Sequence, residues 1–185
     1  MRILGIDPGL NCTGYGLVAH DPPSARLVEG GVIRTDASAS LEVRLATLAQ
    51  GIRGVVSDLD PEVMVVEDLY AKYEHPRTAI LMGHARGVIL LAAAERGLQV
   101  AAYPASLVKR ALTGHGRATK EQVASMVVHL LGLAQAPEPR DVTDALALCL
   151  CHAAPMRLEG RRGALPERLA RALADQGAVP RRERR

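Results

Sequence analysis

The sequence is poor in aromatic residues: among 185 residues it has no Phe, no Trp and four Tyr. A hydrophobic core must therefore be built from aliphatic side chains, which are plentiful because 48% of the residues are hydrophobic. This length and composition predict one globular domain with a full apolar core and exclude a largely disordered chain. Because tyrosine is so rare, a tyrosine in a loop becomes a candidate functional residue.

Cysteine is scarce as well: the sequence has three, Cys12, Cys149 and Cys151. An odd number without paired spacing excludes a disulfide framework and a structural zinc site. No secretory signal is apparent, and no apolar stretch approaches the roughly 18 residues needed to cross a bilayer. We therefore expect reduced thiols, no membrane association and a cytoplasmic location.

The net charge of +3 is unevenly distributed. Residues 156–185 hold nine Arg and four acids, and we expect them to form a flexible, Arg-rich tail after a domain at 1–155. A second basic segment, 105–120, contains no acid. It holds Gly114-His115-Gly116 and the basic residues Lys109, Arg110, Arg117 and Lys120. This segment is either a phosphate-binding patch or a solvated loop.

The hydrophobic pattern changes period along the chain. Three strands joined by short turns predict an antiparallel meander over residues 2–6, 13–19 and 26–35, with a bulge or bend at Gly30-Gly31. Two further strands are expected over 62–66 and 99–103. Helices are expected over 41–55, 76–97, 105–112, 120–131 and 141–153, and the fourth of them begins with a capping box at Thr119 to Gln122. This order predicts an α/β fold, with a five-stranded mixed sheet flanked by helices.

Four acids fall at positions where a ligand site is expected. Asp7 ends the first strand and Glu67 ends the fourth, so parallel neighbouring strands would direct both into one crevice. Asp141 and Asp144 lie three residues apart on a helix and share one face. Each acid alone also fits a structural role: Asp7 in a turn, Glu67 as a solvated strand end, Asp141 as a helix cap and Asp144 as a favourable charge at a helix start. Asp68 competes with Glu67 as the functional acid.

Four carboxylates at one point would raise each other's pKa unless cations compensate them. Two Mg²⁺ or Mn²⁺ ions would balance the charge and suit hard oxygen ligands. A pair of such ions activates water and stabilises the leaving oxygen in phosphodiester hydrolysis. The acids therefore predict a metal-dependent nuclease.

Four ordered motifs resemble the RuvC Holliday junction resolvases. They are Gly5-Ile6-Asp7-Pro8-Gly9 with Thr13-Gly14-Tyr15-Gly16, then Val65-Val66-Glu67-Asp68-Leu69-Tyr70, Gly83-His84-Ala85-Arg86-Gly87, and Asp141-Val142-Thr143-Asp144-Ala145-Leu146-Ala147. The resemblance covers roughly residues 1–155 and implies an RNase H-like fold. It also implies an endodeoxyribonuclease that nicks two opposing strands of a four-way DNA junction in recombination and repair, with the four acids as its catalytic metal ligands.

The resemblance implies further DNA contacts. Lys109 and Lys120 match functional lysines near the scissile phosphate, and Tyr70 matches an aromatic residue that stacks on junction bases. The loop with His115 and Arg117 differs from more apolar family versions, although both side chains suit phosphate. The family normally works with a branch-migration motor of the RuvA and RuvB type.

A four-way junction has two-fold symmetry, so symmetric nicking calls for a homodimer. The helix over 78–96 is apolar on more than one face, and Gly83 and Gly87 permit close approach, so we expect it either to form the dimer contact or to be a core helix. Three other functions stay open on the residues alone: an actin-like ATPase or sugar kinase, a junction-binding protein without catalysis, and a nuclease for another structure such as an RNA–DNA hybrid.

Overall fold

The computed structural model describes residues 1–68 and 76–154. Its five strands form one mixed sheet in the order β3-β2-β1-β4-β5. β1, β2 and β3 form the predicted antiparallel meander, and β4 and β5 run parallel to β1. The strands are β1 (Arg2–Asp7), β2 (Cys12–Asp21), β3 (Ser24–Arg34), β4 (Val63–Glu67) and β5 (Gln99–Tyr103). The predicted sheet is therefore confirmed, whereas the expected tail at 156–185 lies outside the described residues.

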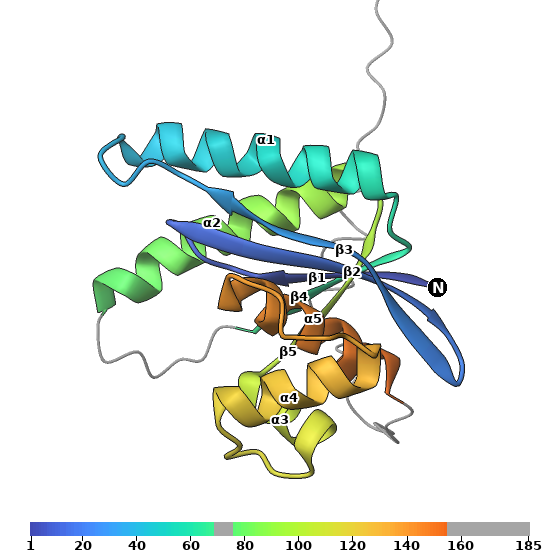
Figure 1. Cartoon of the computed structure of the whole chain (residues 1–185). Coiled ribbons are helices and arrows are strands. Elements are labelled where there is room, and N and C mark those ends of the chain that lie inside the picture. The colour runs from blue at the N-terminus through green and yellow to red at the C-terminus, as the bar shows by residue number, and fades with distance from the viewer. Residues whose placement is uncertain (69–75, 155–185) are drawn as a thin grey trace, which may run out of the picture.

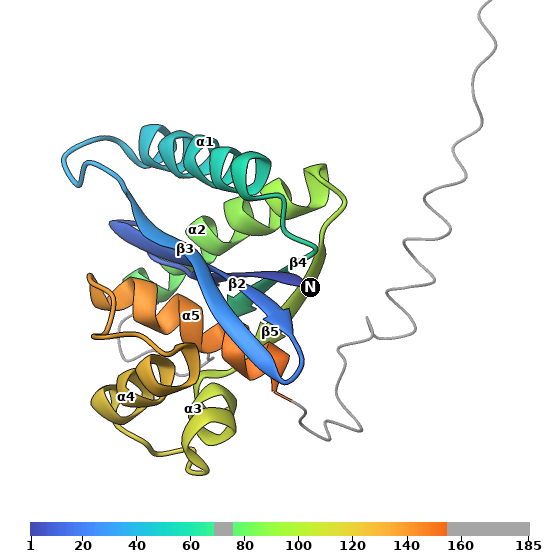
Figure 2. The same cartoon turned by 45° about the vertical axis from the view of Figure 1, so that its right-hand side comes forward.

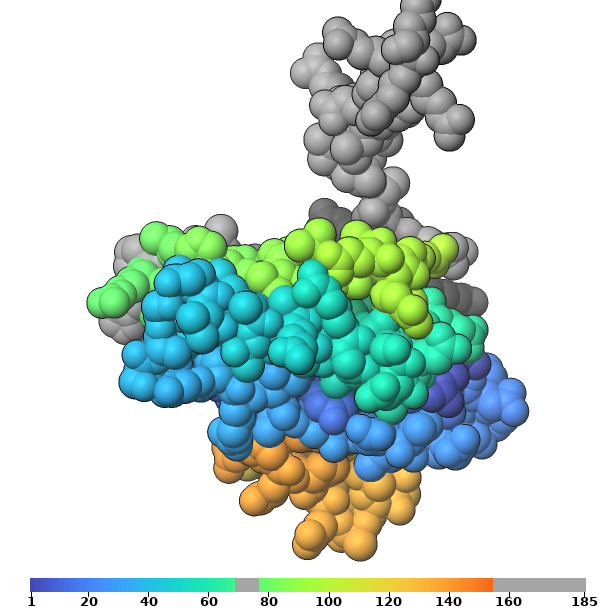
Figure 3. Space-filling model, turned by 90° about the horizontal axis from the view of Figure 1, so that it is seen from above, coloured from blue at the N-terminus to red at the C-terminus, as the bar shows by residue number. Residues whose placement is uncertain are grey.

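Helices cover both faces of the sheet (Figures 1 and 2). One face carries α1 (Leu41–Leu59) and α2 (Pro76–Glu95), which lie side by side (Figure 3). The other face carries α3 (Ala105–Thr113), α4 (Lys120–Leu131) and α5 (Arg140–Ala153). Each helical layer packs against its own set of buried aliphatic side chains, as expected for a sheet covered on both faces.

The alternation of side chains along β1 and β4 decides where their terminal acids point. Ile3 packs in the core shared with α5, whereas Leu4 and Ile6 pack in the core shared with α1 and α2. Because the side-chain period of a strand is two, Asp7 continues the α5 side of the sheet. The same alternation carries Glu67 to that side, since Val63 and Val65 belong to the core around α5.

Two glycines let α5 approach the sheet very closely. A Cβ atom added at Gly5 would overlap the carbonyl oxygen of Ala145, and one at Gly14 would overlap that of Asp141. Gly14 is also the cross-strand partner of Asp7. The absence of a side chain at Gly14 therefore sets the spacing between the strand that carries Asp7 and the helix that carries Asp141.

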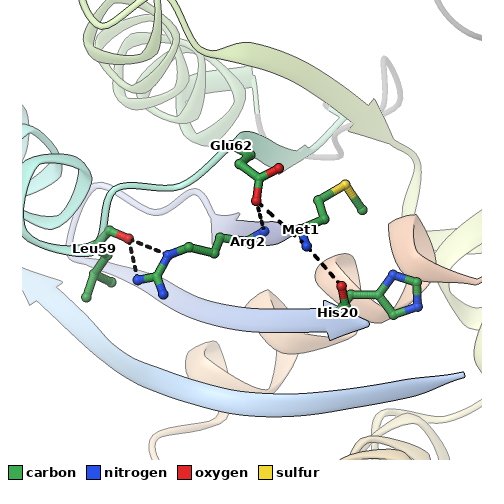
Figure 4. A network of polar contacts seen from close by, with 5 residues as sticks. All are labelled: Met1, Arg2, His20, Leu59 and Glu62. Atoms are coloured by element: carbon green, nitrogen blue, oxygen red, sulfur yellow. Dashed lines mark hydrogen bonds and ion pairs between the residues drawn. The ribbon is translucent and has the colours of Figure 1, made fainter. Parts of the chain in front are cut away.

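A polar network fixes the opposite end of β1 (Figure 4). The Arg2 guanidinium donates to the carbonyl of Leu59, with Nε at 3.1 Å and Nη2 at 2.6 Å. The Arg2 backbone N–H donates to Glu62 Oε1 at 2.9 Å, and the Met1 ammonium donates to the His20 carbonyl at 3.0 Å. These bonds tie β1 to the start of β4 and to the end of β2, which supports the register of the two acid-bearing strands.

One expected irregularity lies elsewhere. Gly30 and Gly31 pair regularly with β2, and the register shift falls between Leu17 and Val18 of β2, which pair with Glu29 and Leu27. Val28 is thus the extra residue of β3, so the prediction of a bulge at the glycines is wrong. The glycines have another use there, because a Cβ at Gly30 would press on the Val142 side chain of α5.

α2 is apolar on its outer surface as well as on its inner one. Ala85, Ile89 and Ala93 are fully buried against the sheet, whereas Ile80 and Leu91 are 60% and 54% exposed. Within the described residues, Arg77–Glu95 is long and apolar enough to cross a membrane by length and composition, with a mean hydropathy of 1.3. The expectation that no stretch approaches that length is therefore wrong, although one face of α2 is buried against the sheet.

Candidate active site

The four predicted acids come together where β1, β4 and α5 meet. β1 and β4 are parallel neighbours with Ile6 paired to Val66, so Asp7 and Glu67 leave adjacent strand ends on the same side. Their side chains share a hydrogen bond. The first turns of α5 bring Asp141 and Asp144 into electrostatic range of Asp7. The structure thus assembles carboxylates from three separate elements, as the sequence predicts.

The cluster is electrostatically unfavourable when it is fully ionised. Burial raises the pKa of Asp7 from 3.8 to about 8, and the nearby carboxylates of Glu67, Asp144 and Asp141 add to the rise. Burial and the charge of Asp144 also raise the pKa of Glu67. Near neutral pH the metal-free cluster therefore holds a proton that an exposed aspartate would have lost.

Two lysines supply positive charge to the cluster. Lys120, the first residue of α4, places Nζ 2.7 Å from Asp144 Oδ2, and this bond raises the pKa of the lysine. The positive charges of Lys120 and Lys109 both lower the pKa of Glu67, although burial outweighs them. The predicted capping box at Thr119 is confirmed, since its hydroxyl accepts from the Gln122 N–H and its own N–H donates to the Gln122 side chain.

The donor set suits a hard divalent cation. All four groups are carboxylates, and burial together with the neighbouring carboxylates raises the pKa of Asp7 to about 8. In the part of the chain described here, no three His, Cys, Asp or Glu side chains already stand in a geometry that encloses an ion. The chemistry of the four carboxylates nevertheless fits such a cation.

Asp141 does not cap its helix. α5 begins at Arg140 with Pro139 as the N-cap residue, so Asp141 stands within the first turn. The structural alternative of a capping carboxylate is therefore wrong, and the Asp141 side chain is available to the cluster. A carboxylate in the first turn is also stabilised by the helix dipole.

Sequence reasoning missed Cys12, whose thiol lies against the Asp141 carboxylate. Burial raises the pKa of this thiol, and the charge of Asp141 raises it further. The strand period places Cys12 on the same strand face as Gly14, but only the structure shows that this face packs against α5.

Arg86 of α2 was missed as well. Its Nε donates to the Glu67 carbonyl at 3.4 Å, and its Nη2 lies 3.4 Å from Asp68 Oδ1. Asp68 is exposed and directed to this arginine, whereas Glu67 is half-buried beside Asp7. The structure thus places Glu67, and not Asp68, beside Asp7.

The remaining candidates lie at the edge of the site or beyond the described residues. His115 and Arg117 are exposed in the connection between α3 and α4. The His115 N–H donates to Thr113 Oγ1 at 3.2 Å, which holds the start of that connection. Tyr70 falls within residues 69–75 and lies outside the described residues.

A mixed sheet of this order, with acids gathered at the ends of β1 and β4 and on the last helix, defines the class as an RNase H-like nuclease. The model of the family "Crossover junction endodeoxyribonuclease RuvC" matches residues 3–152. The chain belongs to this RuvC family of crossover junction endodeoxyribonucleases.

Individual relatives agree with this assignment. The crossover junction endodeoxyribonuclease RuvC of Moorella thermoacetica is 51% identical over 159 residues, which cover 85% of this chain and 95% of the relative. That of Rhodopirellula baltica is 48% identical over 149 residues, which cover 80% of this chain and 84% of the relative. The structure of Thermus thermophilus RuvC in complex with a Holliday junction substrate superposes with a TM-score of 0.79 at 40% identity, covering 83% of this chain and 93% of that one.

Proposed function

We propose that this protein is a metal-dependent endodeoxyribonuclease that resolves four-way (Holliday) DNA junctions by paired symmetric nicks in recombination and repair. Its membership of the crossover junction endodeoxyribonucleases supports the activity. The convergence of four carboxylates from β1, β4 and α5 is the observation that supports assigning the activity to particular residues. The Thermus thermophilus relative was solved with a Holliday junction, which supports the same substrate for this chain.

Asp7, Glu67, Asp141 and Asp144 would together hold two Mg²⁺ or Mn²⁺ ions. When bound, the ions supply an activated water and stabilise the leaving oxygen of the phosphodiester. The carboxylates orient that chemistry because close packing of α5 on β1 and β2 fixes their spacing. Lys120 and Lys109 bring positive charge to the scissile phosphate, since both already act on the electrostatics of the cluster.

The basic connection between α3 and α4 would bind the DNA backbone. Arg117 and His115 are exposed there, and α4 begins directly afterwards at Lys120. Backbone N–H groups at a helix start favour anions, so this connection suits phosphates near the cut. Tyr70 follows the strand that carries Glu67, and we assign it the stacking contact with junction bases.

We assign the outer face of α2 to a homodimer contact. Ile80, His84, Gly87 and Leu91 follow each other at helical spacing, and the glycine is open enough to admit a close neighbour. A lipid environment does not suit a helix whose other face is embedded against β1 and β4. A second copy of the chain suits this face, because an isologous contact would relate two active sites by a two-fold axis, as the junction requires.

The cellular setting follows from the substrate. We place the protein in the cytoplasm with the chromosome, and we expect it to act with a branch-migration motor of the RuvA and RuvB type.

A cleavage assay on a synthetic four-way junction tests the proposed function. With Mg²⁺ or Mn²⁺, the protein should produce paired nicks in opposing strands, whereas linear duplex DNA and an RNA–DNA hybrid should be poor substrates. Asp7→Asn should bind the junction and fail to cut it, and the surface control Asp36→Asn should cut normally. Binding without any nick by the unaltered protein would leave a non-catalytic junction-binding protein, and preferential cutting of the hybrid would indicate a different nuclease.

A further inference from the structure

A pocket of about 460 Å³ lies between α4 and the beginning of α5. These two helices lie against each other on the same face of the sheet (Figure 2). The pocket falls in the size range of small-ligand sites in proteins. It adjoins the acid cluster, because Lys120 and Asp144 line the pocket and also belong to that cluster.

Four of the residues that line the pocket are apolar, and the other seven are polar or charged. Ala124 and Val128 of α4 form one side, and Ala136 and Pro137 of the connection to α5 form another. Small side chains and a proline ring leave room for a flat group between them. The Thr143 hydroxyl also lines the pocket, and it donates to the Pro137 carbonyl at 2.8 Å, which fixes this wall.

The charges at the edge disfavour a phosphate inside. Three acids line the pocket, Glu121, Glu138 and Asp144, against two cations, Lys120 and Arg140. The cations are already engaged, because Lys120 bonds Asp144 at 2.7 Å and Arg140 bonds Glu121 at 3.2 Å. A neutral, flat group with hydrogen-bond donors and acceptors on its rim fits such a pocket better than an anion does. Nucleobases have this chemistry.

We propose that this pocket receives the base of a nucleotide next to the scissile phosphate and contributes to base preference at the cut. The proposal rests on the proposed junction cleavage, since it takes the phosphate to lie at the acid cluster. Lys120 and Asp144 border both sites, so a phosphate at the cluster brings the adjoining base to the mouth of the pocket. Unpairing at a junction makes such a base available at a lower free-energy cost than in a continuous duplex.

The test combines a substrate lacking one base with a variant lacking the pocket. Junctions carrying an abasic tetrahydrofuran nucleotide on either side of the cut are compared with the intact junction in single-turnover cleavage. The unaltered protein should lose roughly 10- to 100-fold in rate when the missing base is the one that enters the pocket. Ala124→Phe, which fills the pocket from α4, should cut the intact junction more slowly by a similar factor. In this variant the abasic nucleotide should cause no further loss.

A matched control places the same aromatic ring on the outer surface of α4. Leu130 is 45% exposed and does not line the pocket, so Leu130→Phe should behave as the unaltered protein does with both substrates. Junction affinity of Ala124→Phe should remain unchanged, because phosphate contacts dominate affinity. The proposal is overturned if the pocket substitution and the abasic nucleotide lower the rate by independent, multiplying factors. The comparison of abasic with intact junctions also tests the proposal without a variant. Equal cleavage rates of the unaltered protein on the two substrates overturn the proposal as well. Absence of cleavage by the unaltered protein would instead refute the proposed function.

Discussion

Replacing Asp7 by asparagine should stabilise the metal-free protein near neutral pH while abolishing cleavage. The carboxyl is buried beside Glu67, Asp144 and Asp141, which together with burial hold its pKa at about 8. Ionising it inside the folded protein therefore opposes folding. Asparagine has nearly the same shape and carries no charge, so it removes the repulsion without emptying the site.

The sign of the effect follows from the two pKa values. In the unfolded chain Asp7 ionises near 3.8, whereas in the folded protein it stays protonated to about 8. Between these values the folded state binds the extra proton, so stability falls as the pH rises. Below pH 4 both states are protonated and the penalty vanishes. The gain from Asp7→Asn should thus be near zero at pH 4 and largest at pH 8.

The size of the effect has an upper bound. A rise of the pKa from 3.8 to about 8 corresponds to about 6 kcal/mol at most. Relaxation of the site and burial of the amide reduce this, and we expect a gain of about 1–3 kcal/mol at pH 8. For a domain of this size that is an increase in Tm of roughly 3–10 °C.

Urea and thermal unfolding at several pH values, without divalent cations, measure this gain. Saturating Mg²⁺ should stabilise the unaltered protein more than the variant, because only the folded site binds the ion. Asp36→Asn is a control whose effect on stability should have the opposite sign. Hydrogen bonds from Ser38 lower the pKa of the exposed Asp36 carboxyl, so removing that carboxylate should slightly destabilise the protein at neutral pH. A variant less stable than the unaltered protein at pH 8, or a gain that does not grow with pH, would refute the reasoning.

Three further substitutions test the geometry of the site and its surroundings. Gly14→Ala should push the Asp141 backbone away, destabilise the fold by about 1–3 kcal/mol and raise the Mg²⁺ concentration needed for cleavage. Gly54→Ala, which has open space around it, should have neither effect. Equal Mg²⁺ requirements for the two variants would refute the argument that Gly14 sets the spacing of the acids. Lys120→Met should reduce the cleavage rate by roughly 10²- to 10³-fold with junction binding retained, and an unchanged rate would exclude a role at the phosphate. Leu91→Glu should convert a dimer to a monomer in sedimentation, and a monomeric mass for the unaltered protein would contradict the contact at α2.

The features that could be predicted from the sequence depend on local rules. The five strands, their two-residue period and the Thr119 capping box depend on neighbouring residues, and the structure confirms them, with most strand ends shifted by one or two residues. The convergence of Asp7 and Glu67 followed from one further step, the parallel pairing of β1 with β4. That step needs only the rule that carboxyl ends of parallel neighbours open to the same edge.

The features that could not be predicted depend on how distant segments pack. The extra residue of β3 falls at Val28, and Gly30 lies against Val142 of α5; no strand pattern reveals either. The position of Cys12 against Asp141 depends on the height of α5 above the sheet. The pocket beside Lys120 likewise requires the angle between α4 and α5, which the sequence of neither helix specifies.

The position of α5 explains how a cluster of repelling carboxylates can exist in a stable fold. Nine residues of this helix are buried, from Val142 to Cys151 with Asp144 as the gap. Burying a single large aliphatic side chain contributes about 1.5–3 kcal/mol, so the buried valine and three leucines of α5 are together enough to offset the penalty at Asp7. The same close contact, permitted by Gly5 and Gly14, holds the acids at a spacing that they would not adopt on their own. The free energy of the core thus maintains an electrostatic repulsion that a bound cation would relieve.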